Sequence, residues 1–156
     1  MSGPRLVGLI SDTHGQLRPE AVAALRGCDL IVHAGDIGGQ AVLDRLAELA
    51  PVFAVHGNCD RDLARSLPAT QTLEIGDLLV HVLHDLGRLD PRPETSRLAV
   101  VISGHSHHPL VRRRDGVLYV NPGSAGPRRF DLPVTVGLLR VDGAAAEARI
   151  VELDVG

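Results

Sequence analysis

A wholly apolar run at residues 98–102 is followed at once by the polar stretch Ser-Gly-His-Ser-His-His-Pro at residues 103–109. An apolar run without alternation indicates a strand that is buried on both faces, in a sheet covered by other layers. His105 and His107 are two positions apart, so in extended backbone both imidazoles point to the same side. Neutral imidazoles that converge where a strand ends suit a transition metal. The alternative is a polar loop whose histidines cap backbone groups.

Four more apolar segments are predicted as strands, and each is followed by residue types that bind metals. The segments are residues 6–10, 30–33, 52–55 and 78–83, and they lead into Asp12 and His14, Asp36, Asn58 and His84 respectively. Helices predicted at 19–26 and 40–49 separate the first three strands. This alternation indicates a parallel sheet with right-handed crossovers, and ligands bind at the carboxyl ends of such strands.

The second half of the chain has the pattern of antiparallel hairpins. Gly76-Asp77, Asp115-Gly116 and Asp142-Gly143 each separate two apolar segments, which is a hairpin signal. Residues 86–97 are rich in Gly, Pro and charge, and we predict a loop there. A length of 156 residues fits one α/β domain spanning 1–156.

The composition argues against several classes of function. The net charge is −3 and aromatic residues make up 2% of the chain, so neither charge nor stacking surface points to a nucleic-acid partner. Cys28 and Cys59 have no metal-binding spacing and imply no disulfide framework. The chain carries no apolar signal segment or membrane-length apolar run, so we expect a cytoplasmic protein without a membrane partner. Assembly into a homo-oligomer stays open.

The seven candidate ligands are carboxylates, imidazoles and one amide, without thiolate. This mixture suits Mn²⁺, Fe or Zn²⁺ better than Ca²⁺, and it exceeds what one tetrahedral zinc ion takes. Two metals about 3.5–4 Å apart can share a carboxylate, hold a hydroxide and clamp a phosphoryl group. A carboxylate is suited to this sharing because each of its two oxygens can hold one metal.

Five motifs in chain order resemble those of the calcineurin-like metallophosphoesterases. They are Asp12-x-His14, Gly35-Asp36, Gly57-Asn58-Cys59-Asp60, His84 and Gly104-His105-Ser106-His107. The short chain, Cys59 and the stretch Asn-Pro-Gly-Ser at 121–124 resemble the small single-domain branch of that family. That branch contains bacterial and archaeal phosphodiesterases and the scaffold subunit of the retromer coat. The resemblance implies a four-layer αββα sandwich.

The resemblance also implies roles for individual residues. One metal would be bound by Asp12, His14, Asp36 and His107, and the other by Asp36, Asn58, His84 and His105. Catalytic roles would fall to Asp36, Asn58 and His105, and substrate contacts to Asn58, Cys59 and His84. We expect His33 and His56 to support the ligand loops by hydrogen bonds, and residues 121–124 to buttress the site.

Our hypothesis is a phosphodiesterase that uses two divalent transition metals and attacks a small phosphate ester with a metal-bridging hydroxide. We expect Mn²⁺ first, with Ni, Zn, Fe or Mg as alternatives. The competing hypothesis is a non-catalytic scaffold or metal-binding protein of the same fold. Two positions depart from the family pattern. Cys59 stands where larger family members have a histidine that assists departure of the leaving group. Asp85 stands where family members often have Gly, and its carboxylate could repel an anionic substrate or face solvent.

Overall fold

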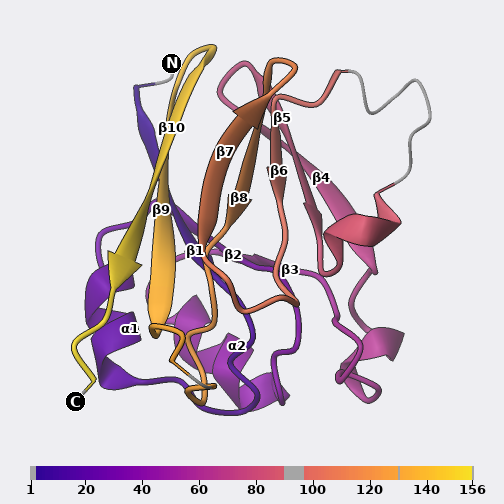
Figure 1. Ribbon diagram of the computed structural model, residues 1–156, viewed down its shortest axis with the longest axis vertical. Coiled ribbons are helices and arrows are strands. Elements are labelled where there is room, and N and C mark those ends of the chain that lie inside the picture. Colours follow the sequence, from indigo (N-terminus) through magenta and orange to yellow (C-terminus); the bar gives the residue numbers. More distant parts are fainter. Residues whose placement is uncertain (1–2, 90–96, 130, 156) are drawn as a thin grey trace.

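Two five-stranded sheets stack face to face in the computed structural model, which describes residues 3–89, 97–129 and 131–155 (Figure 1). The first sheet has the strand order β10-β9-β1-β2-β3. Its strands are β1 (Arg5–Ile10), β2 (Leu30–His33), β3 (Val52–Ala54), β9 (Thr135–Asp142) and β10 (Ala145–Glu152). β1, β2 and β3 are parallel, whereas β9 runs antiparallel to both β1 and β10.

The second sheet has the order β4-β5-β6-β8-β7. Its strands are β4 (Thr70–Ile75), β5 (Leu78–Leu83), β6 (Val100–Ile102), β7 (Leu110–Arg114) and β8 (Val117–Asn121). β5, β6 and β8 are parallel, and β4 and β7 pair antiparallel at the two edges. All three predicted hairpins are therefore confirmed.

The main core fills the space between the sheets, because alternate residues of each strand point inward. Val7, Leu9 and Val32 of the first sheet pack with Val80 and Ile102 of the second. The other face of the first sheet is covered by α1 (Pro19–Leu25) and α2 (Gln40–Ala47), whose apolar residues pack around Ile31. The two helices lie where the sequence predicts them.

The outer face of the second sheet has a thinner cover in the part of the chain that the structure describes. Leu83 and Val101 are buried there, with Leu89, Leu98 and Tyr119 packed over or beside them. Two short 3₁₀ helices, η1 (Leu63–Arg65) and η2 (Leu86–Arg88), were not predicted. η2 occupies the start of the predicted loop 86–97, and positions 90–96 of that loop lie outside the described residues. None of the described helices is long and apolar enough to cross a bilayer.

The parallel strands of both sheets end at the same side of the sandwich. The segments that follow β1, β2 and β3 therefore meet the segments that follow β5, β6 and β8. Backbone hydrogen bonds join these segments, from Asp12 N to Gly35 O and from Gly104 N to His84 O. The predicted ligands are brought together because they come directly after these strands.

Candidate metal centre

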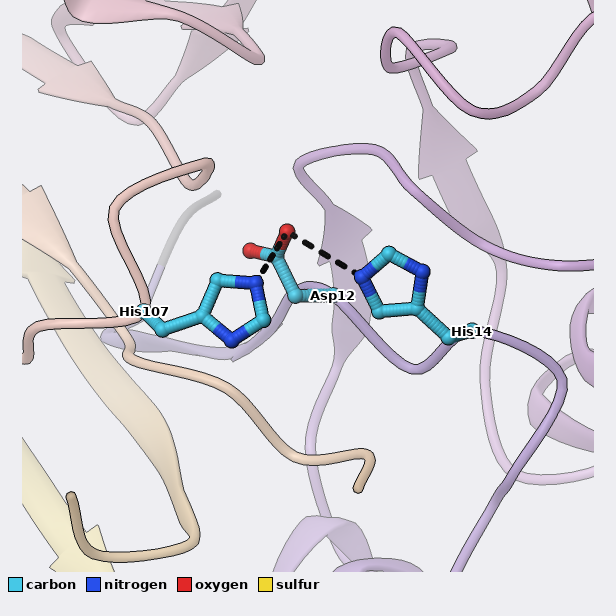
Figure 2. Close-up of side chains that lie close together, drawn as sticks. All are labelled: Asp12, His14 and His107. Carbon is cyan, nitrogen blue, oxygen red and sulfur yellow. Dashed lines mark ion pairs between the residues drawn. The ribbon is translucent and has the colours of Figure 1, made fainter. Parts of the chain in front are cut away.

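The first group of ligands consists of Asp12, His14 and His107 (Figure 2). One ligand atom from each residue lies within 4.8 Å of the other two. Asp12 Oδ1 is 3.8 Å from His14 Nε2 and 3.4 Å from His107 Nε2. The carboxylate lies between the two imidazoles in Figure 2. Asp12 and His14 follow β1 and His107 follows β6, so both sheets supply ligands to this group.

The second group consists of Asp36, His84 and His105. His84 Nδ1 donates a hydrogen bond to Ala34 O at 2.8 Å, so the neutral ring keeps a free lone pair on Nε2. That Nε2 atom faces Asp36 Oδ2 at 3.2 Å and His105 Nδ1 at 3.3 Å. A carbonyl that holds the far nitrogen of an imidazole is the usual support of a metal-binding histidine.

Asp36 belongs to both sides of the site. Its Oδ2 atom lies 3.2 Å from His84 Nε2 and 3.8 Å from His14 Nε2, while Oδ1 accepts a hydrogen bond from Cys59 N at 2.8 Å. Burial acts to raise the pKa of this carboxyl, but in the metal-free protein a hydrogen bond from the protonated form of His84 and one from Cys59 N outweigh it and lower the pKa to about 2. The geometry differs from the expected sharing by both oxygens, because Oδ2 alone faces ligands of both groups.

The donor set fits cations because several of its atoms are buried and unsatisfied. In the described chain, four buried side-chain polar atoms lack a hydrogen-bond partner, and three of these belong to Asp12, His14 and His107. An unpartnered buried polar atom ordinarily costs about 1–3 kcal/mol. Asp12 Oδ1 and His14 Nε2 face each other in the first group and would recover that cost by coordinating a divalent transition metal, whereas His107 Nδ1 lies on the far side of a ring whose Nε2 faces Asp12.

The backbone is strained at the same residues. Six non-glycine residues in the described chain have a positive φ, and Asp115 in a hairpin is the one that is not a predicted ligand. The other five are Asp12, His14, Asp36, His105 and His107, with φ between 47° and 71°. Such conformations cost on the order of 1 kcal/mol or more each, and they persist where the surrounding structure demands them. Here the strain occurs directly after three strands, β1, β2 and β6, whose following segments meet at one side of the sandwich.

Two glycines permit close approach beside the carboxylates. A Cβ atom at Gly57 would lie 2.2 Å from Asp36 Oδ1, and one at Gly104 would lie 2.0 Å from Ser11 Oγ and 2.8 Å from Asp12 Oδ2. Both approaches are shorter than side-chain contacts allow. The glycines in these two motifs are therefore required by the space around Asp12 and Asp36.

Asn58 and Cys59 lie at the exposed rim of the site. The sulfur of Cys59 forms a third close group with His14 and Asp36. One ligand atom from each of these residues lies within 4.8 Å of the other two. Asn58 is exposed and lines a cavity together with His84 and His105. The structure therefore brings together all seven predicted ligands and the predicted substrate contact Cys59.

Asp60 is a supporting residue for which the sequence analysis predicts no role. Its buried carboxylate accepts hydrogen bonds from Ile37 N, Gly38 N and Gly57 N at 2.9–3.1 Å. It thereby joins the loop after β2 to the loop after β3. The relative position of the loops that carry Asp36 and Asn58 is consequently fixed.

His33 supports the site through a fully buried chain of hydrogen bonds. Gly35 N donates to His33 Nδ1 at 3.1 Å, so the ring proton resides on Nε2, which donates to Thr13 Oγ1 at 3.0 Å. The Thr13 hydroxyl in turn donates to Ile37 O at 2.7 Å. The expected supporting role of His33 is thus confirmed. His56 instead lines the cavity beside Asn58. Its ring has no hydrogen-bond partner among the described residues.

His33 should make folding stability depend on pH. Burial lowers the pKa of this imidazole from 6.5 to about 3, so the folded protein keeps it neutral while the unfolded chain protonates it near 6.5. Its contribution is therefore complete above pH 6.5 and is lost progressively as the pH falls toward 3. We expect wild type to lose about 2 kcal/mol from this group between pH 7.5 and pH 5.

Urea unfolding of wild type and His33→Gln, both in chelator, measures this contribution. The difference in unfolding free energy between the two proteins should shrink by about 2 kcal/mol over that pH interval. A difference that is constant with pH would show that His33 is not kept neutral by the fold.

Residues 121–124 buttress the histidine loop as expected. Asn121 Nδ2 donates to Gly104 O at 3.0 Å and to Ser106 Oγ at 3.1 Å. Ser124 Oγ donates to Asp12 O at 3.1 Å. The turn after β8 therefore supports the ligand segments of both sheets.

Comparisons with known proteins agree with this geometry. The profile of the calcineurin-like phosphoesterase superfamily domain matches residues 6–144. The chain belongs to this superfamily. A "probable metallophosphoesterase" of Methanothermobacter thermautotrophicus is 39% identical over 94% of this chain and 91% of its own length. Phosphodiesterase YfcE of Escherichia coli is 29% identical, with 85% of each chain covered.

Solved structures confirm the fold. The zinc complex of Vps29 from Entamoeba histolytica superposes on this phosphoesterase domain with a TM-score of 0.73. Its sequence identity is 21%, and the alignment covers 94% of this chain and 98% of that one. The predicted α/β sandwich of the calcineurin-like phosphoesterases is thus confirmed, and Vps29 has the same fold.

The departure at Asp85 has a local explanation in this phosphoesterase. Asp85 Oδ1 accepts a hydrogen bond from Gly87 N at 3.0 Å and so caps η2, while Oδ2 lies 3.8 Å from Arg88 Nε. The carboxylate is also 39% exposed and borders the cavity beside His84, so its charge acts on an anion that enters there. It orders the turn that follows His84.

Proposed function

We propose that this protein is a phosphodiesterase that uses two divalent transition metals. The observation that carries the proposal is the pair of donor groups on either side of Asp36 Oδ2, with buried unsatisfied ligand atoms around them. Asp12, His14, Asp36 and His107 would hold one ion. Asp36, Asn58, His84 and His105 would hold the other. Mn²⁺ fits this oxygen and nitrogen set, as do Zn²⁺, Fe, Ni²⁺ and Mg²⁺.

When bound, two such metals lower the pKa of a water nucleophile and neutralise charge on a phosphoryl group. The protein's own residues then have to orient the ester. Asn58 lines the cavity beside His84 and His105, where its carbonyl oxygen could hold the second ion and its amide N–H could donate to a non-bridging phosphoryl oxygen. His105 approaches the same space from the opposite sheet, so the phosphoryl group would be held between β3 and β6.

The residue at position 59 supports a diester rather than a monoester as substrate. Partial desolvation and the nearby carboxylate of Asp36 raise the pKa of the Cys59 thiol. A thiol is a poor hydrogen-bond donor to a leaving oxygen, and a thiolate is no donor. A substrate whose leaving group needs little protonation, such as an aryl or activated alkyl diester, suits this arrangement.

Removal and return of metal tests the proposal. Hydrolysis of bis(p-nitrophenyl) phosphate should fall to background after exhaustive chelation and return with added Mn²⁺. The same protein should hydrolyse p-nitrophenyl phosphate far more slowly. Full diesterase activity in protein shown by elemental analysis to be metal-free would contradict the proposal. Metal-loaded, folded protein without any diesterase activity would instead favour the scaffold hypothesis.

A further inference from the structure

A cavity of about 490 Å³ opens directly beside the second group of ligands. Its lining includes three residues of the proposed site, Asn58, His84 and His105, and also His56, Thr70 and Arg88. Among the described residues of this lining, Arg88 is the one with a permanent positive charge. A substrate that places its phosphoryl group at the metals would extend one arm into this cavity.

The position of Arg88 follows from the turn after β5. β5 ends at Leu83, His84 is a ligand, and Asp85 then caps η2, which ends at Arg88. The Asp85 cap fixes the first residues of this turn by its 3.0 Å hydrogen bond from Gly87 N. Only three residues, 85–87, therefore separate Arg88 from the ligand His84.

The Arg88 guanidinium keeps most of its donors free. Its ion pair with Asp85 is 3.8 Å long and joins one carboxylate oxygen to Nε, and no other described residue forms an ion pair with it. The side chains of Arg88 and Asp85 are 87% and 39% exposed, so solvent weakens the attraction between them. The terminal N–H groups are thus available to a ligand, and guanidinium groups bind phosphate through two parallel hydrogen bonds.

We propose that Arg88 forms an anion subsite, and that the substrate is a phosphodiester whose arm in this cavity carries a second phosphate group. This inference rests on the proposed phosphodiesterase function and adds the class of substrate. Arg88 is then a specificity-determining residue. Asp85 has two effects, because it holds the turn in place and its charge moderates the attraction of the subsite for anions.

Two substrates with the same leaving group test the subsite. They are the p-nitrophenyl ester of thymidine 5′-phosphate and the same ester with an added 3′-phosphate. We expect wild type to show a kcat/KM at least about tenfold higher for the phosphorylated ester, the effect of one charge-assisted hydrogen-bonded contact. In Arg88→Gln this preference should fall to about one, mainly through KM, while kcat/KM for the unphosphorylated ester stays within about twofold.

Two more variants distinguish an effect of the charge of Arg88 from an effect on the structure of the turn. Arg114→Gln removes another arginine, which is 70% exposed and has its own aspartate 4.0 Å away, and it should keep the wild-type preference. Asp85→Asn keeps the oxygen that caps η2 but removes the charge beside Arg88, so the preference should rise about two- to fivefold. A preference that is absent in wild type, or unchanged in Arg88→Gln, would overturn the subsite.

Binding measurements distinguish failure of the subsite from failure of the proposed function. Calorimetry on Mn²⁺-loaded protein compares thymidine 3′,5′-bisphosphate with thymidine 5′-phosphate. Tighter binding of the bisphosphate that is lost in Arg88→Gln supports the subsite even if no diester is hydrolysed, and that result would overturn the phosphodiesterase alone. Diester hydrolysis with equal affinity for both nucleotides would overturn the subsite alone.

Discussion

Asp36→Asn is expected to lower diesterase turnover by more than about a hundredfold and to weaken the binding of both metals. Asp36 Oδ2 lies 3.2 Å from His84 Nε2 and 3.8 Å from His14 Nε2, so one atom faces ligands of both groups. An amide places either a neutral oxygen or an N–H donor there, and the N–H group is no ligand. The charge that would neutralise two cations is lost in either case.

Asp12→Asn is the matched comparison, because Asp12 faces His14 and His107 of the first group most closely. It should mainly weaken one metal. Elemental analysis after dialysis, circular dichroism and the diesterase assay measure metal content, folding and turnover for both variants. Two tightly held metals and near-normal turnover in Asp36→Asn would show that this residue is not shared between the ions.

Asp60→Ala is expected to destabilise the protein by about 3–5 kcal/mol, although Asp60 belongs to neither ligand group. The substitution removes the acceptor of three backbone N–H groups, on Ile37, Gly38 and Gly57. Those groups lie in the loops that carry Asp36 and Asn58. Metal affinity should therefore fall about 10- to 100-fold as well, since the ligands lose their fixed separation.

Chemical denaturation and Mn²⁺ binding measure both effects of the Asp60 change. Asp60→Asn keeps one acceptor oxygen and should lie between wild type and Asp60→Ala. Asp29→Ala is a suitable control, because Asp29 accepts a single exposed hydrogen bond, from Leu6 N, and should cost about 1 kcal/mol. If Asp60→Ala matched Asp29→Ala in stability and kept wild-type metal affinity, the proposed bracing of the two loops would be wrong.

Much of this architecture could be predicted because its signals are local. The apolar segments, the hairpin turns and the helices at 19–25 and 40–47 each follow from a few neighbouring residues. The candidate ligands could be predicted because each comes directly after a buried strand. Parallel strands bring their carboxyl ends together, so sequence order alone places these residues at one edge.

The partners of the supporting residues could not be predicted because these contacts join distant parts of the chain. Nothing near Asp60 in sequence shows that its carboxylate accepts hydrogen bonds from Ile37 and Gly38. The link from His33 to Thr13 likewise depends on the pairing of β1 with β2. The orientation of Asp36, with one oxygen toward both groups, follows from its φ of 55°, which only tertiary structure imposes.

η2 was missed for a different reason. Its residues Leu86–Arg88 have no helical periodicity, and a single turn of 3₁₀ helix is too short to produce one. The signal that could have found it is Asp85 two residues before Gly87, an arrangement in which an aspartate caps backbone N–H groups. This short turn places Arg88 at the cavity, so the specificity proposal depends on the structure.

Titration of the metal-free protein with Mn²⁺ tests the two-metal proposal most directly. Bound metal and the rate of bis(p-nitrophenyl) phosphate hydrolysis are measured on the same samples at each step. We predict that two Mn²⁺ ions bind per chain and that activity reaches its maximum only when both are bound. A protein that binds a single ion, or that is fully active with one ion per chain, would contradict the assignment of these seven residues to two metals.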